Sequence, residues 1–254
     1  MKLSILVPFR DADGTRTRAK DWIVARWAHF WPDAEIIEGT DDGRDPFNKS
    51  QAMNDAASRA TGDTFILLDA DTWVEAGAIR TALELIARGV PWVVPATKNF
   101  RMSREWSERV LSMAPSAPLP SVMARDCDTA PGPIVGFCHV LSRAAYESAG
   151  GMDERIRGWG GEDTCFVRAT DAIVGKHHKL TVWKDQRGQR HPAIVVCLWH
   201  DRPRDRSRRR IWIGQDRRFE ADKRRIVATY YRARSREAML QVVAEAQAAR
   251  SVST

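Results

Sequence analysis

Short apolar runs alternate with helix-length segments over the first hundred residues of this 254-residue chain. The apolar runs are Leu3 to Val7, Ala34 to Glu38, Thr64 to Leu68 and Pro91 to Pro95. The segments between them that have helical spacing are Thr17 to Trp31, Asn48 to Ala60 and Ala76 to Arg88. This alternation predicts an α/β fold, with a Rossmann-like, mostly parallel central sheet and helices on both faces.

The second half of the chain has a less regular pattern. Arg101 to Pro133 is rich in Pro, Ser and Met, which predicts an irregular loop or lid. Further strands are expected at Pro133 to Ser142 and Ala193 to Trp199, with a helix over Glu162 to Ala172. We therefore expect one catalytic domain over residues 1–205, with a basic, helical extension over residues 206–254 packed on it.

Charged side chains follow several of the expected strands. Arg10, Asp41 or Asp42, and the pair Asp69 and Asp71 each come directly after an apolar run. Ligands of doubly wound sheets bind at the carboxyl ends of the strands. These side chains are therefore expected to converge on one crevice.

The Asp69-Ala70-Asp71 string has the chemistry of a site for a hard divalent cation. Carboxylates at i and i+2 can share Mn²⁺ or Mg²⁺, which also binds substrate phosphates. His200 follows a later apolar run, and its imidazole could complete such a site with Asp71. Taken alone, the two aspartates could equally cap a loop, and the histidine could be a structural hydrogen-bonding group.

The string from Gly158 to Asp163, G-W-G-G-E-D, is the most unusual in the chain. Its glycines allow the backbone to approach a ligand closely, and Trp159 could stack on a sugar ring. Glu162 and Asp163 open a helix, and one could hold an acceptor hydroxyl while the other acts as a general base. The alternative is a glycine-rich turn with an acidic helix start.

Taken together and in order, these motifs resemble those of the β-1,4-galactosyltransferase group and related GT-A glycosyltransferases, including family 2. The matching strings are Ile5 to Arg10, Phe47-Asn48-Lys49, Leu67 to Asp71, Gly136 to Ser142, Gly150 to Asp153, Gly158 to Asp163 and His200-Asp201-Arg202. The second has Lys where the family pattern has Arg. The resemblance implies a GT-A fold and a nucleotide-sugar-dependent transferase, from a bacterium or a phage.

The resemblance also implies roles for individual residues. Asp71 and His200 would bind Mn²⁺ or Mg²⁺, and Asp69 would support the metal or contact the nucleotide sugar. The residues on the donor side would be Pro8, Arg10, Asp42, Lys49 and Gly136. The sugar and acceptor side would be formed by Trp159, Gly160, Gly161 and Glu162, with Asp163 as the base.

The residue after Glu162 bears on stereochemistry. Retaining polypeptide N-acetylgalactosaminyltransferases resemble this region but have Asn at that position, whereas this chain has Asp163. A carboxylate there suits a general base, so we predict inversion at the anomeric carbon. UDP is the nucleotide that the resemblance favours.

The net charge of +7 is unevenly distributed, with eleven Arg and Lys residues between residues 202 and 225. This segment could contact a polyanion, or it could be a solvated basic helix. The acceptor could accordingly be a glycan, a glycoside or a protein. Two alternatives are the same chemistry on hydroxymethylated bases of phage DNA, and a non-catalytic sugar- or nucleic-acid-binding module.

Two features bear on the compartment. No C-x-x-C pair occurs among the four cysteines, which indicates free thiols rather than a zinc site or disulfides. No apolar run reaches the length of a membrane span. We therefore expect a cytoplasmic protein of a bacterial cell or a phage-infected host.

Overall fold

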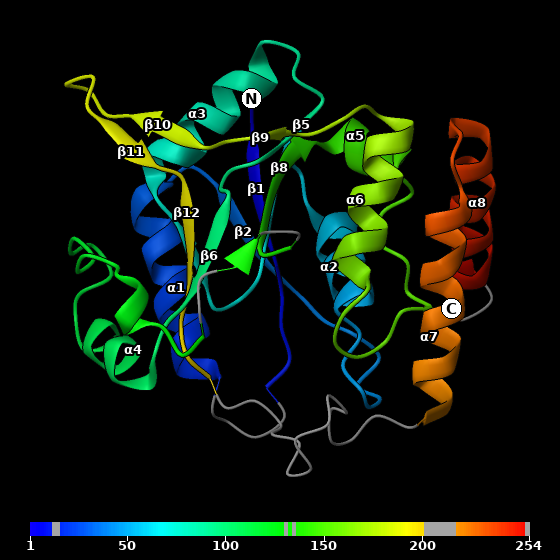
Figure 1. Cartoon of the computed structure of the whole chain (residues 1–254), viewed down its shortest axis with the longest axis horizontal. Helices are drawn as coiled ribbons and strands as arrows, with labels where there is room; N and C mark the ends of the chain where they lie inside the picture. Colours follow the sequence, from blue (N-terminus) through cyan, green and yellow to red (C-terminus); the bar gives the residue numbers. More distant parts are fainter. Residues whose placement is uncertain (12–15, 130–131, 134–135, 201–216, 252–254) are drawn as a thin grey trace.

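A computed structural model describes residues 1–11, 16–129, 132–133, 136–200 and 217–251. Its main sheet has the strand order β2-β1-β3-β8-β5-β9 (Figure 1). The bounds are β1 (Leu3–Pro8), β2 (Glu35–Gly39), β3 (Thr64–Leu68), β5 (Trp92–Val94), β8 (Cys138–Ser142) and β9 (His178–Lys179). Only β8 runs antiparallel to its described neighbours, β3 and β5. The predicted mostly parallel α/β sheet is confirmed.

A smaller sheet extends the fold beside the main one, with the order β4-β12-β6-β7. Its strands are β4 (Thr72–Val74), β12 (Ile194–Cys197), β6 (Lys98–Arg101) and β7 (Gly132–Pro133), and a separate hairpin pairs β10 (Val182–Lys184) with β11 (Arg190–Pro192). The late apolar run was predicted as a strand, and it forms β12. β12 pairs with β4, and β4 begins directly after Asp71. The carboxyl end of β12 therefore lies next to the Asp69–Asp71 turn.

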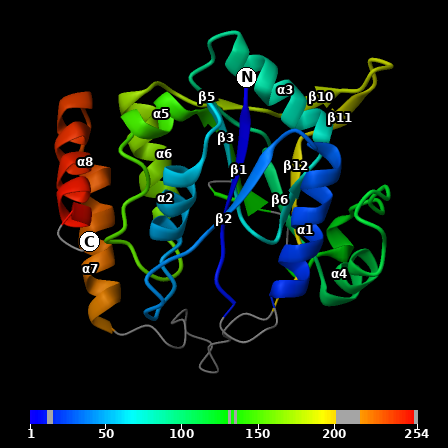
Figure 2. The same ribbon diagram turned by 180° about the vertical axis from the view of Figure 1, so that it is seen from behind.

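Helices cover both faces of the main sheet. The helices up to residue 173 are α1 (Thr17–Phe30), α2 (Lys49–Arg59), α3 (Ala76–Ala87), α4 (Arg104–Leu111), α5 (Arg143–Ser148) and α6 (Glu162–Ile173). Figure 2 shows α1 and α2 in front of the sheet, whereas α6 lies in front in the opposite view of Figure 1. The helices that the sequence predicted in this part of the chain are confirmed.

The prediction of an irregular segment from Arg101 to Pro133 is wrong in part, because α4 lies within it. Ser103 caps this helix, since its hydroxyl accepts a hydrogen bond from the backbone N–H of Trp106. Trp106 and Val110, four residues apart, are both buried. One helical turn separates such positions, so the pair forms the apolar face that holds the helix against the core.

Aromatic residues fill the core beside α1. The rings of Trp27 and Trp73 lie edge to face with centroids 5.1 Å apart. The buried guanidinium of Arg26 lies 4.4 Å from the Trp73 ring and donates hydrogen bonds of 2.7 Å to the carbonyls of Pro115 and Ala117. A buried charge is costly unless it is paired in this way, so these bonds fix the segment after α4 to the core.

The C-terminal helices α7 (Arg217–Arg232) and α8 (Arg236–Ser251) stand at one end of the molecule, beside α6 (Figures 1 and 2). They share with α6 a second apolar cluster, formed by Ile156, Cys165, Ala169, Tyr230, Ala233, Met239 and Val243. Two helices thus occupy the described part of this region, and its division from the catalytic domain stays a prediction. The predicted boundary at residue 205 lies outside the described residues.

Two smaller observations complete the fold. All four cysteines are free thiols, as the sequence predicted. Within the part of the chain that the structure describes, every helix is too short or too polar to cross a lipid bilayer.

Candidate active site

The Asp69-Ala70-Asp71 turn lies at the carboxyl end of β3 and is held by backbone hydrogen bonds on two sides. The N–H of Asp69 donates to the carbonyl of Phe137, 3.0 Å away, just before β8. The carbonyl of Asp71 accepts from the N–H of Leu198, 2.8 Å away, just after β12. The two carboxylates are therefore positioned by both sheets at once.

Asp71 and His200 face each other, with Oδ2 and Nε2 3.4 Å apart. Burial alone would raise the pKa of Asp71, but the hydrogen bond to His200 and the charges of His200, Arg16 and Arg101 hold it well below its usual range. Asp71 is thus ionised at neutral pH. The sequence predicted that these two residues would meet, and the structure places them together.

This pair fits a divalent cation, although it does not enclose one. A carboxylate oxygen and an imidazole nitrogen are both suitable ligands for Mn²⁺. Among the described residues, no group of three side chains is close enough to hold an ion. Mn²⁺ and Mg²⁺ in transferase sites commonly complete their coordination with phosphate oxygens and water, so two protein ligands suffice.

Lys49, at the first position of α2, lies between two carboxylates. Its Nζ is 2.6 Å from Oδ1 of Asp69 and 2.8 Å from Oδ1 of Asp163. Burial alone would lower the pKa of Lys49, but Asp163, Asp69 and Glu162 together raise it well above its usual value. The donor-side role that the resemblance implies for Lys49 remains a prediction, and in the structure its ammonium group contacts Asp69 and Asp163.

The remaining acids carry more negative charge than one lysine compensates. Burial, helped by the charges of Asp163 and Asp71, raises the pKa of Asp69 to about 6 against the opposing effect of Lys49. Burial and the charge of Asp163 raise the pKa of Glu162 to about 7. The Oε2 atom of Glu162 is buried and has no hydrogen-bond partner within the described part of the chain. A group of this kind is poised to bind a substrate hydroxyl.

Gly136 makes room for Asp163. A Cβ atom added to Gly136 would lie 2.0 Å from Oδ2 of Asp163, well inside van der Waals contact. The sequence placed Gly136 on the donor side, and the structure places it directly against the predicted base. The carboxylate of Asp163 is therefore confined between this glycine and the ammonium of Lys49.

Arg10 and Asp42 lie on a second part of the same sheet edge, around the loop between β2 and α2. Arg10 forms ion pairs with Asp41 and Asp45, with shortest distances of 3.3 and 2.7 Å. Asp42 accepts two hydrogen bonds from Arg157, of 2.9 and 2.7 Å, and these hold the pKa of Asp42 down to about 2. Pro8 ends β1 next to this group and is buried.

Hydrogen bonds join the glycine-rich string, Gly158 to Asp163, to the loop between β2 and α2 and to α7. The N–H of Gly158 donates to the carbonyl of Phe47, 3.0 Å away, and Lys223 donates to the carbonyl of Trp159 at 2.9 Å. Trp159 itself is 57% exposed. Gly160 and Gly161 have φ of 88° and 102°, a conformation that residues with a Cβ rarely adopt. The string therefore ends in a tight turn that delivers Glu162 and Asp163 to the first turn of α6.

Comparison with known protein families identifies the family of this chain. The model of glycosyl transferase family 2 matches residues 17–150, just over half of the chain. The chain belongs to glycosyl transferase family 2. It is therefore a nucleotide-sugar-dependent glycosyltransferase with the GT-A fold. No curated protein matches it by sequence.

Solved structures similar to this family 2 transferase include three other glycosyltransferases. The catalytic domain of Drosophila β1,4-galactosyltransferase 7, solved with xylobiose, is 14% identical over 88% of this chain and 79% of its own, with a TM-score of 0.46. The Pyrobaculum calidifontis mannosyltransferase PcManGT, solved with GDP-Man and Mn²⁺, is 15% identical over 100% and 76%, with a TM-score of 0.43. Residues 1–349 of S. aureus TarS are 13% identical over 71% and 58%, with a TM-score of 0.41.

Sequence reasoning missed two contributors to the site of this family 2 transferase. Arg157 pairs with Asp42 and donates to the carbonyl of Arg44, which ties the loop after β2 to the glycine-rich string. Its position directly before Gly158 was the available signal. Arg101, at the end of β6, lowers the pKa of Asp71 by its charge and lies over the ring of Phe137. Nothing in its local sequence marks it.

Proposed function

We propose that this transferase moves a hexose from a UDP-sugar to a hydroxyl group of a glycan, glycoside or protein, with inversion at the anomeric carbon and with a divalent metal ion. The observation that supports this most directly is the confinement of Asp163. Its carboxylate is held between Gly136 and Lys49, on the edge of the sheet where Asp71 and His200 face each other. A general base needs a fixed position of this kind.

Asp163 would take the proton of the acceptor hydroxyl as its oxygen attacks the anomeric carbon. The bond from that carbon to the diphosphate breaks, and the electron pair leaves with the diphosphate. Glu162, whose pKa is raised to about 7 by burial, would hold the acceptor through hydrogen bonds. Lys49 would keep Asp163 in place and compensate its charge.

A bound Mn²⁺ or Mg²⁺ ion would neutralise the charge that develops on the leaving diphosphate. Asp71 and His200 would hold the ion, and Asp69 would support it or contact the nucleotide sugar. Arg10 and Asp42 would line the nucleotide side, with Arg101 close enough to Asp71 to attract the diphosphate. Trp159 would stack on the acceptor sugar.

The test is a panel of nucleotide sugars assayed for hydrolysis and transfer with and without Mn²⁺, together with NMR of the product linkage. We expect UDP-sugars to be used, with the opposite anomeric configuration in the product. Asp71→Asn should abolish metal-dependent hydrolysis, whereas Asp163→Asn should abolish transfer and leave Mn²⁺ and UDP binding intact. Retention of configuration, or full activity of both variants, would contradict the proposal.

A further inference from the structure

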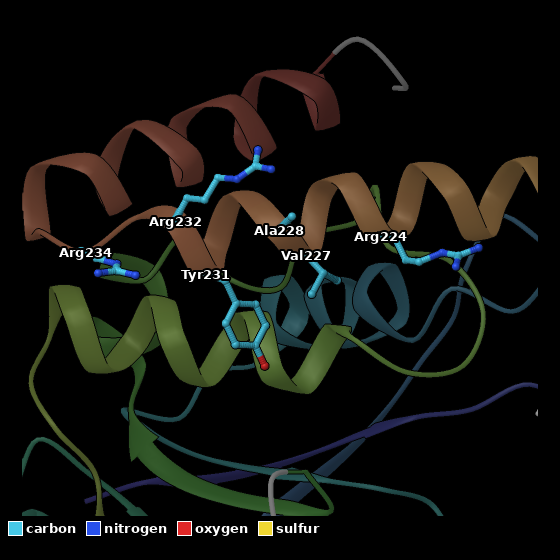
Figure 3. Close-up of a pocket in the computed structure, with 6 residues that line it drawn as sticks. All are labelled: Arg224, Val227, Ala228, Tyr231, Arg232 and Arg234. Carbon is cyan, nitrogen blue, oxygen red and sulfur yellow. The ribbon is translucent and has the colours of Figure 1, made fainter.

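A hollow on the surface of α7 continues from the glycine-rich string. It is lined by Arg224, Val227, Ala228, Tyr231, Arg232 and Arg234 (Figure 3). Val227 joins the two regions, because a Cβ atom added to Gly161 would lie 2.9 Å from its Cγ2. Lys223, one turn earlier, donates to the carbonyl of Trp159. The hollow and the exposed Trp159 are thus held to each other by direct contacts.

The hollow is strongly basic. Arg224, Arg232 and Arg234 are all exposed. Among the described residues, no ion pair joins Arg232 or Arg234 to a carboxylate. Figure 3 shows the Arg232 guanidinium on the side of α7 that faces α8, and that of Arg234 beyond the end of α7. Arg224 lies in the middle of α7, Arg232 ends it and Arg234 follows it. Their like charges repel one another, and an anionic ligand would relieve that repulsion.

An aromatic side chain, that of Tyr231, also lines the hollow. Tyr231 is 53% exposed, and in Figure 3 its ring extends from α7 toward α6. The guanidinium of Arg168 lies 4.4 Å from the centre of this ring and fixes its orientation. A rigid aromatic side chain flanked by arginines can stack on a sugar ring while the guanidinium groups bind carboxylates with paired hydrogen bonds.

We propose that this hollow is an acceptor subsite for an acidic glycan, a sugar chain that bears carboxylates. The inference rests on the proposed transfer to a hydroxyl at Trp159 and names the class of acceptor. The chain would place its reactive end at Trp159 and Glu162, and its more distant sugars along α7 over Tyr231, between Arg224 and Arg232. The α7 helix therefore contributes specificity at a distance from the reacting atoms.

The test compares binding of three fluorescent probes to the whole chain: a hexasaccharide of galacturonic acid, neutral maltohexaose and a twelve-nucleotide thymidine DNA. We expect the acidic hexasaccharide to bind best. Arg232→Gln combined with Arg234→Gln should weaken this binding roughly tenfold or more, since two charge-assisted contacts are lost. The matched control, Arg80→Gln combined with Arg88→Gln, removes the same charge from exposed positions in α3 and directly after it, and should leave the affinity unchanged.

Three results would overturn the inference: no binding of the acidic hexasaccharide, equal weakening in both double variants, or preferential binding of the DNA. Tyr231→Ala supplies an independent readout and should weaken binding of the same hexasaccharide, whereas no effect would count against the stacking role. Hydrolysis of UDP-sugar should be the same in all these variants. If hydrolysis is absent from the unaltered chain, the proposed function fails, whatever the binding result.

Discussion

Lys49 and Asp163, 114 residues apart in the sequence, are joined by two hydrogen bonds of 2.8 and 3.0 Å from one ammonium group to both carboxylate oxygens. The same ammonium contacts Asp69. Lys49 therefore connects the turn that carries the predicted metal ligands with the helix start that carries the predicted base. The side chain is 15% exposed, so solvent screens these interactions only weakly.

Replacement of Lys49 by Met should destabilise the protein and remove transfer. Asp69, Asp163 and Glu162 would be left close together without the positive charge that compensates them. Removal of one partner from a buried ion pair costs about 3 kcal/mol. The free energy of unfolding in urea measures the first effect, and product formation from UDP-sugar measures the second.

Lys20→Met is the matched control for this variant. Lys20 also contacts two carboxylates, at 2.8 Å each, but its partners Asp21 and Glu38 are 61% and 45% exposed. Pairs with exposed partners contribute less than about 1 kcal/mol. Equal losses of stability in Lys49→Met and Lys20→Met would show that Lys49 has no special role.

Gly136→Ala should disable the site without disturbing the fold elsewhere. The new methyl group would meet Oδ2 of Asp163 and force the carboxylate out of position. Displacement of a catalytic group by about 1 Å can reduce the rate roughly a hundredfold. We therefore expect kcat for transfer to fall by about that factor while the affinity for UDP changes little.

Gly188→Ala is the corresponding control. Gly188 lies in the hairpin between β10 and β11, where an added Cβ would meet no atom within 4 Å. Its φ of 78° makes alanine strained there, so a small loss of stability is expected without an effect on kcat. A kcat for Gly136→Ala equal to that of Gly188→Ala would contradict the proposed confinement of Asp163.

Glu162 should make stability depend on pH in an unusual direction. Its folded pKa is raised to about 7 by burial and by Asp163, so the folded state keeps a proton that the unfolded state releases near pH 4.5. Between these values the folded state binds more protons, so stability falls as pH rises. The loss attributable to Glu162 reaches roughly 3 kcal/mol above pH 7.

Glu162→Gln should abolish the part of the fall in stability that Glu162 causes, because glutamine stays neutral at every pH in this range. Urea denaturation at pH 5, 6, 7 and 8 would measure it as a gain in stability over the unaltered protein that grows with pH. Glu84→Gln, on the exposed face of α3, makes the same chemical change and should leave the pH profile unaltered. Parallel profiles for the unaltered protein and Glu162→Gln would disprove the buried-acid interpretation.

Local patterns predicted much of the fold because they need only neighbouring residues. The apolar runs of β1 and β3 are buried throughout, and the spacing of Trp22, Ile23 and Trp27 produced α1. The antiparallel direction of β8 was not predictable, since a buried strand has the same apolar pattern in either orientation. The composition of residues 101–133 favoured an irregular segment, so the eight-residue helix α4 was not predicted.

In the site, too, some contacts followed from local sequence patterns and others did not. Asp71 and His200 were expected to meet because each follows an apolar run that predicts a strand, and their side chains do face each other. The contact of Lys49 with Asp163, and of Gly136 with the same carboxylate, depends on residues from three distant segments. No local pattern records such a contact, so these relationships required the structure.

Asn54 is a further residue that the sequence does not mark, and its replacement should be severely destabilising. Its side-chain NH₂ donates to the carbonyl of Met152 and to Oε1 of Glu154, at 2.8 and 2.7 Å. Its side-chain oxygen accepts from the hydroxyl of Tyr146 and from the N–H of Met152, at 2.6 and 3.0 Å. One buried amide thus fixes the turn that leads into the glycine-rich string.

Asn54→Ala would leave several of these buried groups without partners, each at a cost of about 1 to 3 kcal/mol. We expect a total loss of about 3 kcal/mol and a transfer rate reduced well below that of the unaltered protein under folding conditions. Ser103→Ala is the comparison, because Ser103 caps α4 and removal of a cap typically costs about 1 kcal/mol. Thermal unfolding would rank the two, and a smaller loss for Asn54→Ala would show that the turn before Gly158 is held by other contacts.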